Sequence, residues 1–365
     1  MAILTEGQHI RETYEVERFL GEGAFAEVFR VRHRFLGRQA MKVFKAVGMT
    51  LTDIEEMLGE AILLSKIGHP NIVRVFDANT VQTSKGLFGY FTMENVPGGS
   101  LEKFWQSHGT SFVPVETAVD IMKQVCRGLT VAHSEQPPIV HRDIKPQNIL
   151  VGYEADGLRA RVSDFGLAKR VNPLTLLATA AGTISFKPPE AFTDSKGDSC
   201  AADVWAIGTT LYLLLTDHLP FSFPTDLGWG SRDLFKEKVR PVSDLNADVN
   251  RELDAIILKS ININPADRYQ NAKEMLNDLD KWKPGTGFVS TKSIPADVSK
   301  AALGPVQSSQ NETLAQEMAQ LAFGLKKQGR LADAADAMEE AFNKWPDLRQ
   351  KYAPQVRLWR CGISM

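Results

Sequence analysis

The 365-residue chain has few cysteines, little charge imbalance and no long apolar run. Its cysteines, Cys126, Cys200 and Cys361, are far apart and odd in number, which argues against a disulfide framework and for a reducing compartment. The net charge of −2 gives no basic excess, so we expect no binding to nucleic acid or to an anionic membrane surface.

The most apolar stretch, residues 204–215, is far shorter than the ~20 residues needed to cross a bilayer, so it predicts a buried helix. Residues 1–20 lack a long apolar core behind a positive flank, so we expect no signal peptide and a cytoplasmic location. Apolar residues make up 43% of the chain and charged residues 24%, which leaves room for a sizeable packed core.

The spacing of apolar residues changes along the chain. Residues 10–48 alternate in short apolar runs broken by glycine, which predicts antiparallel strands. Helical spacing begins at Thr52, and Thr52 and Glu55 have the separation of a capping box. After two more strand-like runs, helical spacing dominates from Ser100 to about residue 282.

These patterns divide the chain into three parts. We predict an α+β fold over residues 10–283, with a small antiparallel-sheet lobe at about 10–95 and a larger helical lobe at about 96–283. Residues 284–308 contain Pro, Gly and Ser without a strong period, which is typical of a linker. Residues 309–360 return to helical spacing and predict a short helical hairpin.

A glycine pair, Gly21-Glu22-Gly23, lies between the first predicted strands. Without a Cβ, such backbone N–H groups can approach a phosphate closely, although a plain tight hairpin explains the pair equally well. Strand-like residues including Val28 follow, where a dinucleotide-binding loop needs a helix. The pattern therefore excludes that loop and leaves a hairpin that could cover a phosphate.

Ala40 and Lys42 share one face of an alternating strand, where a small residue beside an amine leaves room for a flat group. A lone lysine is more often a solvated surface residue. Glu60, however, lies at the margin of the apolar stripe of a predicted helix over 52–66, from which its carboxylate can reach inward. An ion pair between Lys42 and Glu60 would position the amine more than stabilise the fold.

Four polar groups stand together in His-Arg-Asp-Ile-Lys-Pro-Gln-Asn, residues 141–148, between two apolar runs. Asp143, Asn148 and the later Asp164 supply oxygen atoms suited to Mg²⁺. One carboxylate could instead accept a proton from an attacking hydroxyl group. A turn rich in Asp explains Asp164 tolerably, but it does not explain this octapeptide between buried strands.

Together these residues resemble the eukaryotic-type (Hanks-type) Ser/Thr protein kinase family, over roughly residues 10–283. The motifs occur in the family's order and are highly specific as a set. They are the glycine-rich loop at 21–28, Lys42, Glu60, HPNIV at 69–73, MENVPGGSL at 93–101, HRDIKPQN, DFGLAK, GTISFKPPE at 182–190, DVWAIG at 203–208 and NPADRY at 264–269.

The resemblance implies a bilobal kinase fold that uses ATP and Mg²⁺. Asp143 would orient and deprotonate the substrate hydroxyl, and Lys145 would steady the transferred phosphoryl group. Lys42, paired with Glu60, would contact the phosphates of ATP. The implied Mg²⁺ ligands are Asn148 and Asp164.

The resemblance also implies a nucleotide site. Met93 would gate the back of the adenine pocket, the backbone of Glu94 and Val96 would bind the adenine edge, and Ala40 and Leu150 would lie on either side of the ring. The implied nucleotide-binding residues are Gly21, Glu22, Gly23, Val28, Ala40, Lys42, Met93, Glu94, Val96 and Leu150.

Lys145 after Asp143, and Thr183, favour Ser and Thr hydroxyl groups as acceptors. The GTISFKPPE segment and the loop before it favour a protein substrate over a small molecule. The alternative is a catalytically silent kinase-fold scaffold. The residues that argue against the scaffold are Lys42, Glu60, Asp143, Asn148 and Asp164.

The sequence departs from the family pattern at two places. Ala26 replaces the third glycine of the loop, which carries a modest cost if that position needs a positive φ. Pro-Pro-Glu replaces the usual Ala-Pro-Glu at 188–190, but Glu190 remains, with Arg268 as its expected buried partner. We interpret this pair, like Asp203, as part of the scaffold.

Residues 167–187 contain a possible switch. We predict autophosphorylation at Thr175 or Thr179, with the phosphate docking on Arg142 and with Lys169 or Arg170 assisting. The alternative is an apolar loop packed constitutively through Leu174, Leu176 and Leu177.

Residues 315–348 resemble a tetratricopeptide unit, with the turn at 327–330 and small or apolar residues where its two helices meet. A single unit cannot bury its own faces. It should therefore dock on the kinase body, pair between chains or meet a partner protein, and we favour partner binding or self-association.

Overall fold

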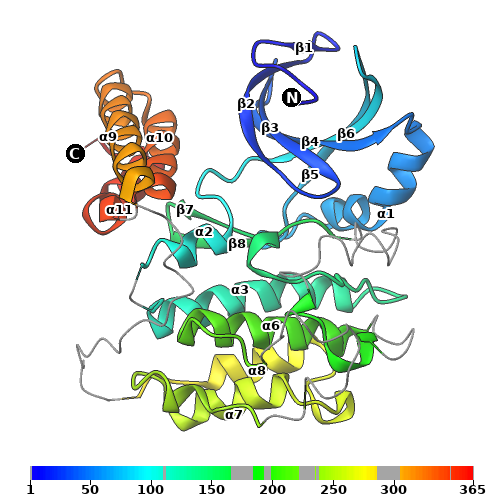
Figure 1. The fold of residues 1–365 in the computed structure, drawn as a ribbon, viewed down its shortest axis with the longest axis vertical. Coiled ribbons are helices and arrows are strands. Elements are labelled where there is room, and N and C mark those ends of the chain that lie inside the picture. The colour runs from blue at the N-terminus through cyan, green and yellow to red at the C-terminus, as the bar shows by residue number, and fades with distance from the viewer. Residues whose placement is uncertain are drawn as a thin grey trace. The chain divides into compact units, whose positions relative to one another are not determined.

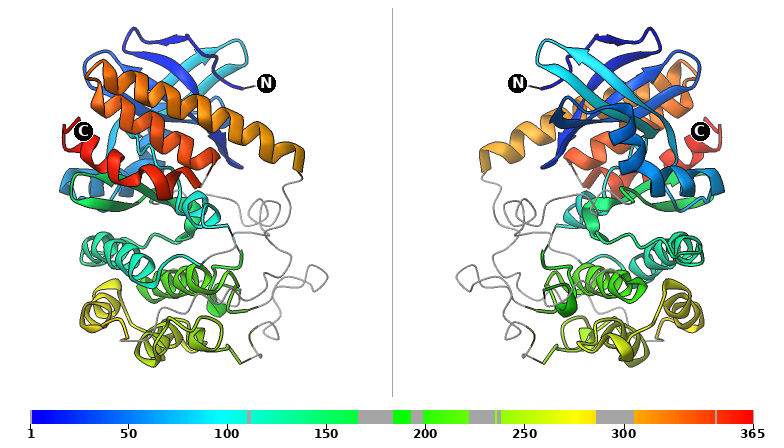
Figure 2. Two further views of the ribbon diagram at one scale, coloured as in Figure 1. Left: turned by 90° about the vertical axis from the view of Figure 1, so that its left-hand side faces the viewer. Right: turned by 90° about the vertical axis from the view of Figure 1, so that its right-hand side faces the viewer.

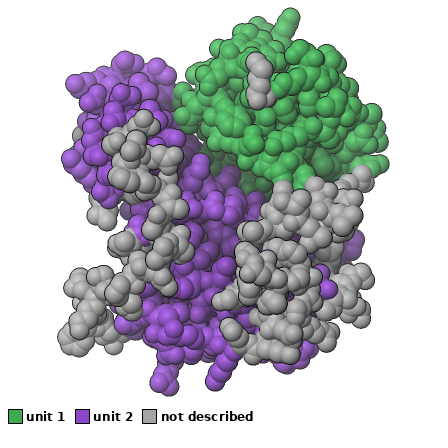
Figure 3. Space-filling model, viewed as in Figure 1, with its two compact units in different colours: residues 1–96, 163–181 green, residues 97–162, 182–365 purple. Residues whose placement is uncertain are grey.

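A computed structural model describes residues 2–109, 112–165, 184–192, 199–221, 235, 238–285, 305–345 and 347–364, without the side chains of residues 60, 305–310 and 350. These residues form two compact units (Figure 3): Met1–Val96 with Ser163–Ala181, and Pro97–Val162 with Gly182–Met365. The first unit is built on an antiparallel sheet and the second is mainly helical, so the predicted α+β fold class is confirmed.

The first unit contains a six-stranded sheet in the order β1-β2-β3-β4-β6-β5 (Figure 1). Met41 and Val43 face its core, so Ala40 and Lys42 point to the opposite face, as the alternation predicted. The strands are β1 (His9–Ile10), β2 (Tyr14–Glu22), β3 (Ala26–His33), β4 (Gly37–Val47), β5 (Val75–Thr83) and β6 (Gly86–Glu94).

Helix α1 (Leu51–Ile67) follows β4. Its N-cap is Thr50, whose hydroxyl oxygen accepts the Asp53 backbone N–H at 3.2 Å, while Asp53 Oδ2 accepts the Thr50 N–H at 2.9 Å. The predicted capping box of Thr52 and Glu55 is therefore wrong. Thr50–Asp53 and Thr52–Glu55 both have the spacing of a capping box, and the extended backbone at Thr50 makes this residue the N-cap.

In the second unit, α3 (Val115–His133), α7 (Arg251–Ser260) and α8 (Ala272–Lys281) pack against α6 (Cys200–Thr216), whose residues from Ala201 to Thr216 are all buried, which confirms the buried helix predicted there. No described helix is long and apolar enough to span a membrane. The elements before residue 285 are α2 (Leu101–Gln106), α3 (Val115–His133), β7 (Ile149–Glu154), β8 (Gly157–Val162), α6 (Cys200–Thr216), α7 (Arg251–Ser260) and α8 (Ala272–Lys281), with short 3₁₀ turns that include η1 (Pro146–Asn148) and η3 (Pro189–Phe192).

Three further helices end the same unit: α9 (Pro305–Lys327), α10 (Leu331–Lys344) and α11 (Asp347–Arg360) (Figure 2). Helix α9 begins at Pro305, whereas the predicted linker extended to residue 308. Gly329, at a φ of 73°, forms the turn between α9 and α10. The three helices share a core that includes Ala322, Met338, Phe342 and Trp359.

These C-terminal helices dock on the body of their own unit. The Phe342 ring meets Tyr153 of β7 edge-on, with 6.4 Å between centroids. The Arg349 guanidinium lies 4.6 Å from the centroid of the Phe104 ring on α2 and also donates to the Ser107 hydroxyl. Asn343 Nδ2 donates to the Pro97 carbonyl at 3.4 Å. One face of the segment is therefore covered by the chain itself.

Candidate functional site

The glycine pair forms the turn of the β2–β3 hairpin in the first unit. The Gly23 N–H donates to the Ala26 carbonyl at 2.8 Å, and Gly21 lies opposite Val28 in the sheet register. Ala26 is a buried residue of β3 and pairs with Phe44, so this position needs no positive φ and alanine carries no backbone cost there. A Cβ added at Gly21 would meet nothing within 4 Å, so the space beside this backbone is open.

Lys42 and Asp164 come together although 122 positions separate them. Lys42 Nζ lies 2.7 Å from Asp164 Oδ1, and the two side chains are 16% and 22% exposed. Asp164 has a φ of 64°, a left-handed conformation that costs energy for a residue with a side chain. The predicted ion pair between Lys42 and Glu60 stays a prediction, because the side chain of Glu60 is outside the described part of the structure.

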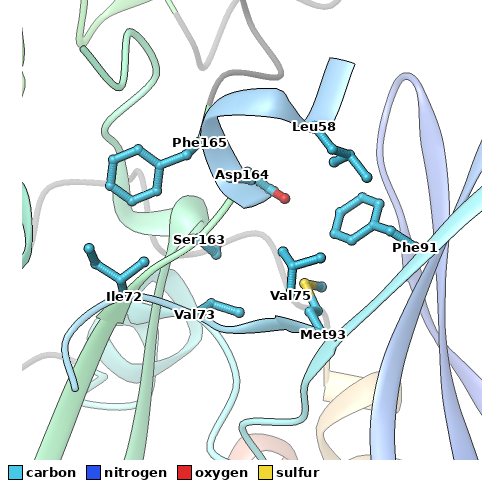
Figure 4. Close-up of a pocket in the computed structure, with 10 residues that line it drawn as sticks. Leu58, Ile72, Val73, Val75, Phe91, Met93, Ser163, Asp164 and Phe165 are labelled. Carbon is cyan, nitrogen blue, oxygen red and sulfur yellow. The ribbon is translucent and has the colours of Figure 1, made fainter. Parts of the chain in front are cut away.

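Asp164 also lines a mostly apolar pocket within the first unit, together with Ser163 (Figure 4). Met93, the predicted gate of the adenine pocket, lines it together with Phe91 and Phe165. In the sheet register Ala40 lies opposite Met93, and Lys42 lies opposite Phe91. Strands β4 and β6 therefore bring the predicted lysine and gate together, and Asp164 joins them by contacting the lysine and lining the pocket with the gate.

The catalytic-loop residues gather in the second unit. Asn148 Nδ2 donates to both the backbone carbonyl and Oδ2 of Asp143, each at 2.8 Å. Lys145 Nζ lies 2.8 Å from the same Oδ2. The Asp143 carboxylate is 23% exposed and is fixed by a neutral donor and a cation, so it is both oriented and accessible.

Buried Asp203 of α6 holds the backbone of this loop. Its carboxylate accepts the N–H groups of His141 at 2.7 Å and Arg142 at 2.9 Å. His133 Nδ1 accepts the Ala272 N–H, so its ring proton is on Nε2, which donates to Asp203 at 3.0 Å. Burial would raise the pKa of Asp203, but the hydrogen bonds from His133 and the His141 backbone outweigh it and hold this pKa below its usual value.

Glu190 and Arg268 form the predicted ion pair. Arg268 Nη1 and Nη2 donate to the two carboxylate oxygens of Glu190 at 2.6 and 2.8 Å. Within the second unit, the pair fastens the turn η3 to the segment that precedes α8. The predicted switch residues fall outside the described part of the chain: Thr175, Thr179, Thr183, Lys169 and Arg170.

Each unit therefore assembles one group of the predicted residues. Glu94 ends β6, where its N–H donates to the Arg74 carbonyl at 2.9 Å, and Val96 ends the first stretch of the first unit. Leu150 lies in β7 of the second unit and pairs with Ser100. The sequence assigned no role to His133, which belongs to no recognisable motif, or to Lys187, which lies within the GTISFKPPE motif and contacts the loop backbone.

Comparison with known proteins gives a consistent result. A sequence profile described as "Protein kinase domain" matches residues 14–279. The chain is 33% identical over 290 residues to "Serine/threonine-protein kinase PknB" of Mycolicibacterium smegmatis, an alignment that covers 77% of this chain and 45% of that protein. It is 30% identical over 317 residues to a "Probable serine/threonine-protein kinase" of Clostridium perfringens, with 84% of this chain and 44% of that protein covered.

The structure is similar to a variant of the PknI kinase domain of Mycobacterium tuberculosis, with a TM-score of 0.55 and 25% identity over 77% of this chain and 99% of that domain. The chain spans about half the length of the curated relatives it matches.

Proposed function

This chain belongs to the protein kinase family, and on that premise we propose that it transfers the γ-phosphate of ATP to Ser or Thr hydroxyl groups of proteins. The observation that carries the proposal is the arrangement of Asp143, whose carboxylate is only partly buried yet is fixed by Asn148 and Lys145. The names of its relatives support Ser and Thr as acceptors.

Phosphoryl transfer needs positioning and charge neutralisation more than covalent chemistry. Asp143 would accept the proton of the substrate hydroxyl, and Lys145 would face the transferred phosphoryl group. Lys42 now contacts Asp164, and its ammonium group would turn to the phosphates when ATP binds. Gly21 and Gly23 would cover those phosphates.

The side chains that would hold Mg²⁺ are Asn148 and Asp164, whose oxygen atoms are suited to this ion. Among the described residues, no cluster of three or more His, Cys, Asp or Glu could hold a metal ion by itself. An ion held by Asn148 and Asp164 would take its remaining ligands from phosphate oxygens and water. When bound, Mg²⁺ neutralises charge on the phosphates.

The test is transfer of labelled phosphate from Mg-ATP to a Ser/Thr protein substrate by the full chain and by Asp143→Asn. Loss of the proton acceptor should lower the rate by at least about 10²-fold. The control is Asp156→Asn, at an exposed turn residue, which should retain the wild-type rate. Equal rates for Asp143→Asn and the wild type would instead indicate a contaminating kinase or a catalytically silent scaffold.

Two finer proposals accompany this function. Autophosphorylation at Thr175 or Thr179 would supply a phosphate that docks on Arg142, and phosphopeptide mapping after incubation with Mg-ATP tests it. The C-terminal helices would bind a partner protein or a second copy through surface that the docked face leaves uncovered, including exposed Leu314 and Leu321 of α9. A variant lacking residues 309–365 that matches the full chain in oligomeric state, solubility and activity would contradict association.

A further inference from the structure

Lys187 contacts the backbone of the catalytic loop from a distant part of the sequence. Its ammonium group donates to the Arg142 carbonyl at 2.5 Å, across 45 positions. Its neighbours Phe186 and Pro188 are both buried, which keeps the lysine half-buried. A cation partly withdrawn from water needs an acceptor, and this acceptor belongs to the residue immediately before Asp143.

The Arg142 backbone is held in an unfavourable conformation by contacts on both of its polar groups. Its φ is 70°, a left-handed value that a residue with a side chain rarely adopts. Its N–H donates to Asp203 of α6 at 2.9 Å, and its carbonyl accepts from Lys187. Asp203 and Lys187 therefore fix the two peptide groups that flank Arg142, and the one held by Lys187 leads directly to Asp143.

Lys187 also joins two parts of the site. It lines the same pocket as Arg142 and Asp143, and it lies three residues before Glu190, whose carboxylate is anchored to Arg268. Displacement of this stretch would withdraw the ammonium group from the loop. The contact thus depends on the placement of the segment that follows the predicted phosphorylation sites.

We propose that Lys187 is a positioning residue that, by binding the Arg142 carbonyl, sets the direction of the Asp143 carboxylate when the substrate-side segment is in place. The inference rests on the proposed kinase function. Lys187 acts through the loop backbone, so it should affect turnover rather than the binding of either substrate.

The test compares the wild type with Lys187→Met, which keeps the length of the side chain but removes its donor, and with Lys187→Arg, which restores a cationic donor. For Lys187→Met we expect kcat to fall about tenfold, with KM for ATP and for the protein substrate within about twofold of wild type. Lys187→Arg should recover most of kcat. The control Lys281→Met, at a side chain 77% exposed, should match the wild type.

Hydrogen exchange of the full chain without ATP provides a second measurement. Backbone amides of residues 139–148 should exchange faster in Lys187→Met than in the wild type or in Lys187→Arg. Unchanged kcat, a rise in KM for the protein substrate alone, or no recovery by Lys187→Arg would overturn the inference. A wild type that transfers no phosphate would refute the proposed function, while exchange would still report on the contact.

Discussion

Replacing Glu190 with glutamine should strongly destabilise the second unit, because it leaves a buried cation without its counter-charge. The Arg268 side chain is 0% exposed and that of Glu190 is 14% exposed. In Glu190→Gln, the guanidinium would keep its bonds to the Asn262 carbonyl at 2.5 Å and the Ile263 carbonyl at 3.1 Å. Neither carbonyl carries a full negative charge.

The expected cost follows from this burial. Breaking a buried ion pair by removing one partner costs about 3–5 kcal/mol, whereas an exposed pair contributes about 0–1 kcal/mol. Arg268→Met should also be costly, because the two carbonyls would lose their donor. The double variant should lose less than the sum of the single variants, with a coupling energy of about 2 kcal/mol.

Urea unfolding of the four proteins, followed by tryptophan fluorescence, measures these costs from midpoints and slopes. The matched control is Lys281→Ala, which breaks an ion pair with Asp278 whose side chains are 77% and 38% exposed. The control should cost no more than about 0.5 kcal/mol. If Glu190→Gln costs no more than the control, the assignment of Glu190–Arg268 as a buried fastener is refuted.

Two further predictions concern the C-terminal helices. Arg349→Ala removes the cation over Phe104 and the donor to Ser107, so local opening of residues 347–360 should cost about 2 kcal/mol less and their amide hydrogens should exchange roughly thirtyfold faster. The control Arg330→Ala, at an exposed side chain, should leave this exchange unchanged. Equal exchange rates in Arg349→Ala and the wild type would exclude the docking contact. Burial raises the pKa of Glu339 from 4.5 to about 7 against the opposing effect of Arg360, so the folded chain holds a proton that the unfolded chain has released. The free energy of unfolding should therefore fall as pH rises between these two pKa values and then level off. Urea midpoints measured at pH 5.5 and 8 should show this fall in the wild type and a smaller fall in Glu339→Gln. An identical pH dependence in both proteins would contradict the raised pKa.

Local features of the sequence were sufficient for the secondary-structure elements, apart from the start of α1, and for the grouping of polar residues in the loop at 141–148. Strand alternation placed Ala40 and Lys42 on one face because side chains alternate wherever a strand forms. Asp143, Lys145 and Asn148 lie within six positions, so a single tight loop brings them together. These relations depend only on near neighbours.

Apart from the Glu190–Arg268 pair, which the family resemblance implied, the tertiary structure alone decided the long-range contacts described above. Asp203 reaches the loop backbone across 61 and 62 positions, and Arg349 reaches the Phe104 carbonyl across 245. Sequence spacing carries no information about such pairs, because they depend on the path of the chain between them. For the same reason, Asp203 was identified only as a scaffold residue, and Lys187 was included in a motif but was given no role of its own.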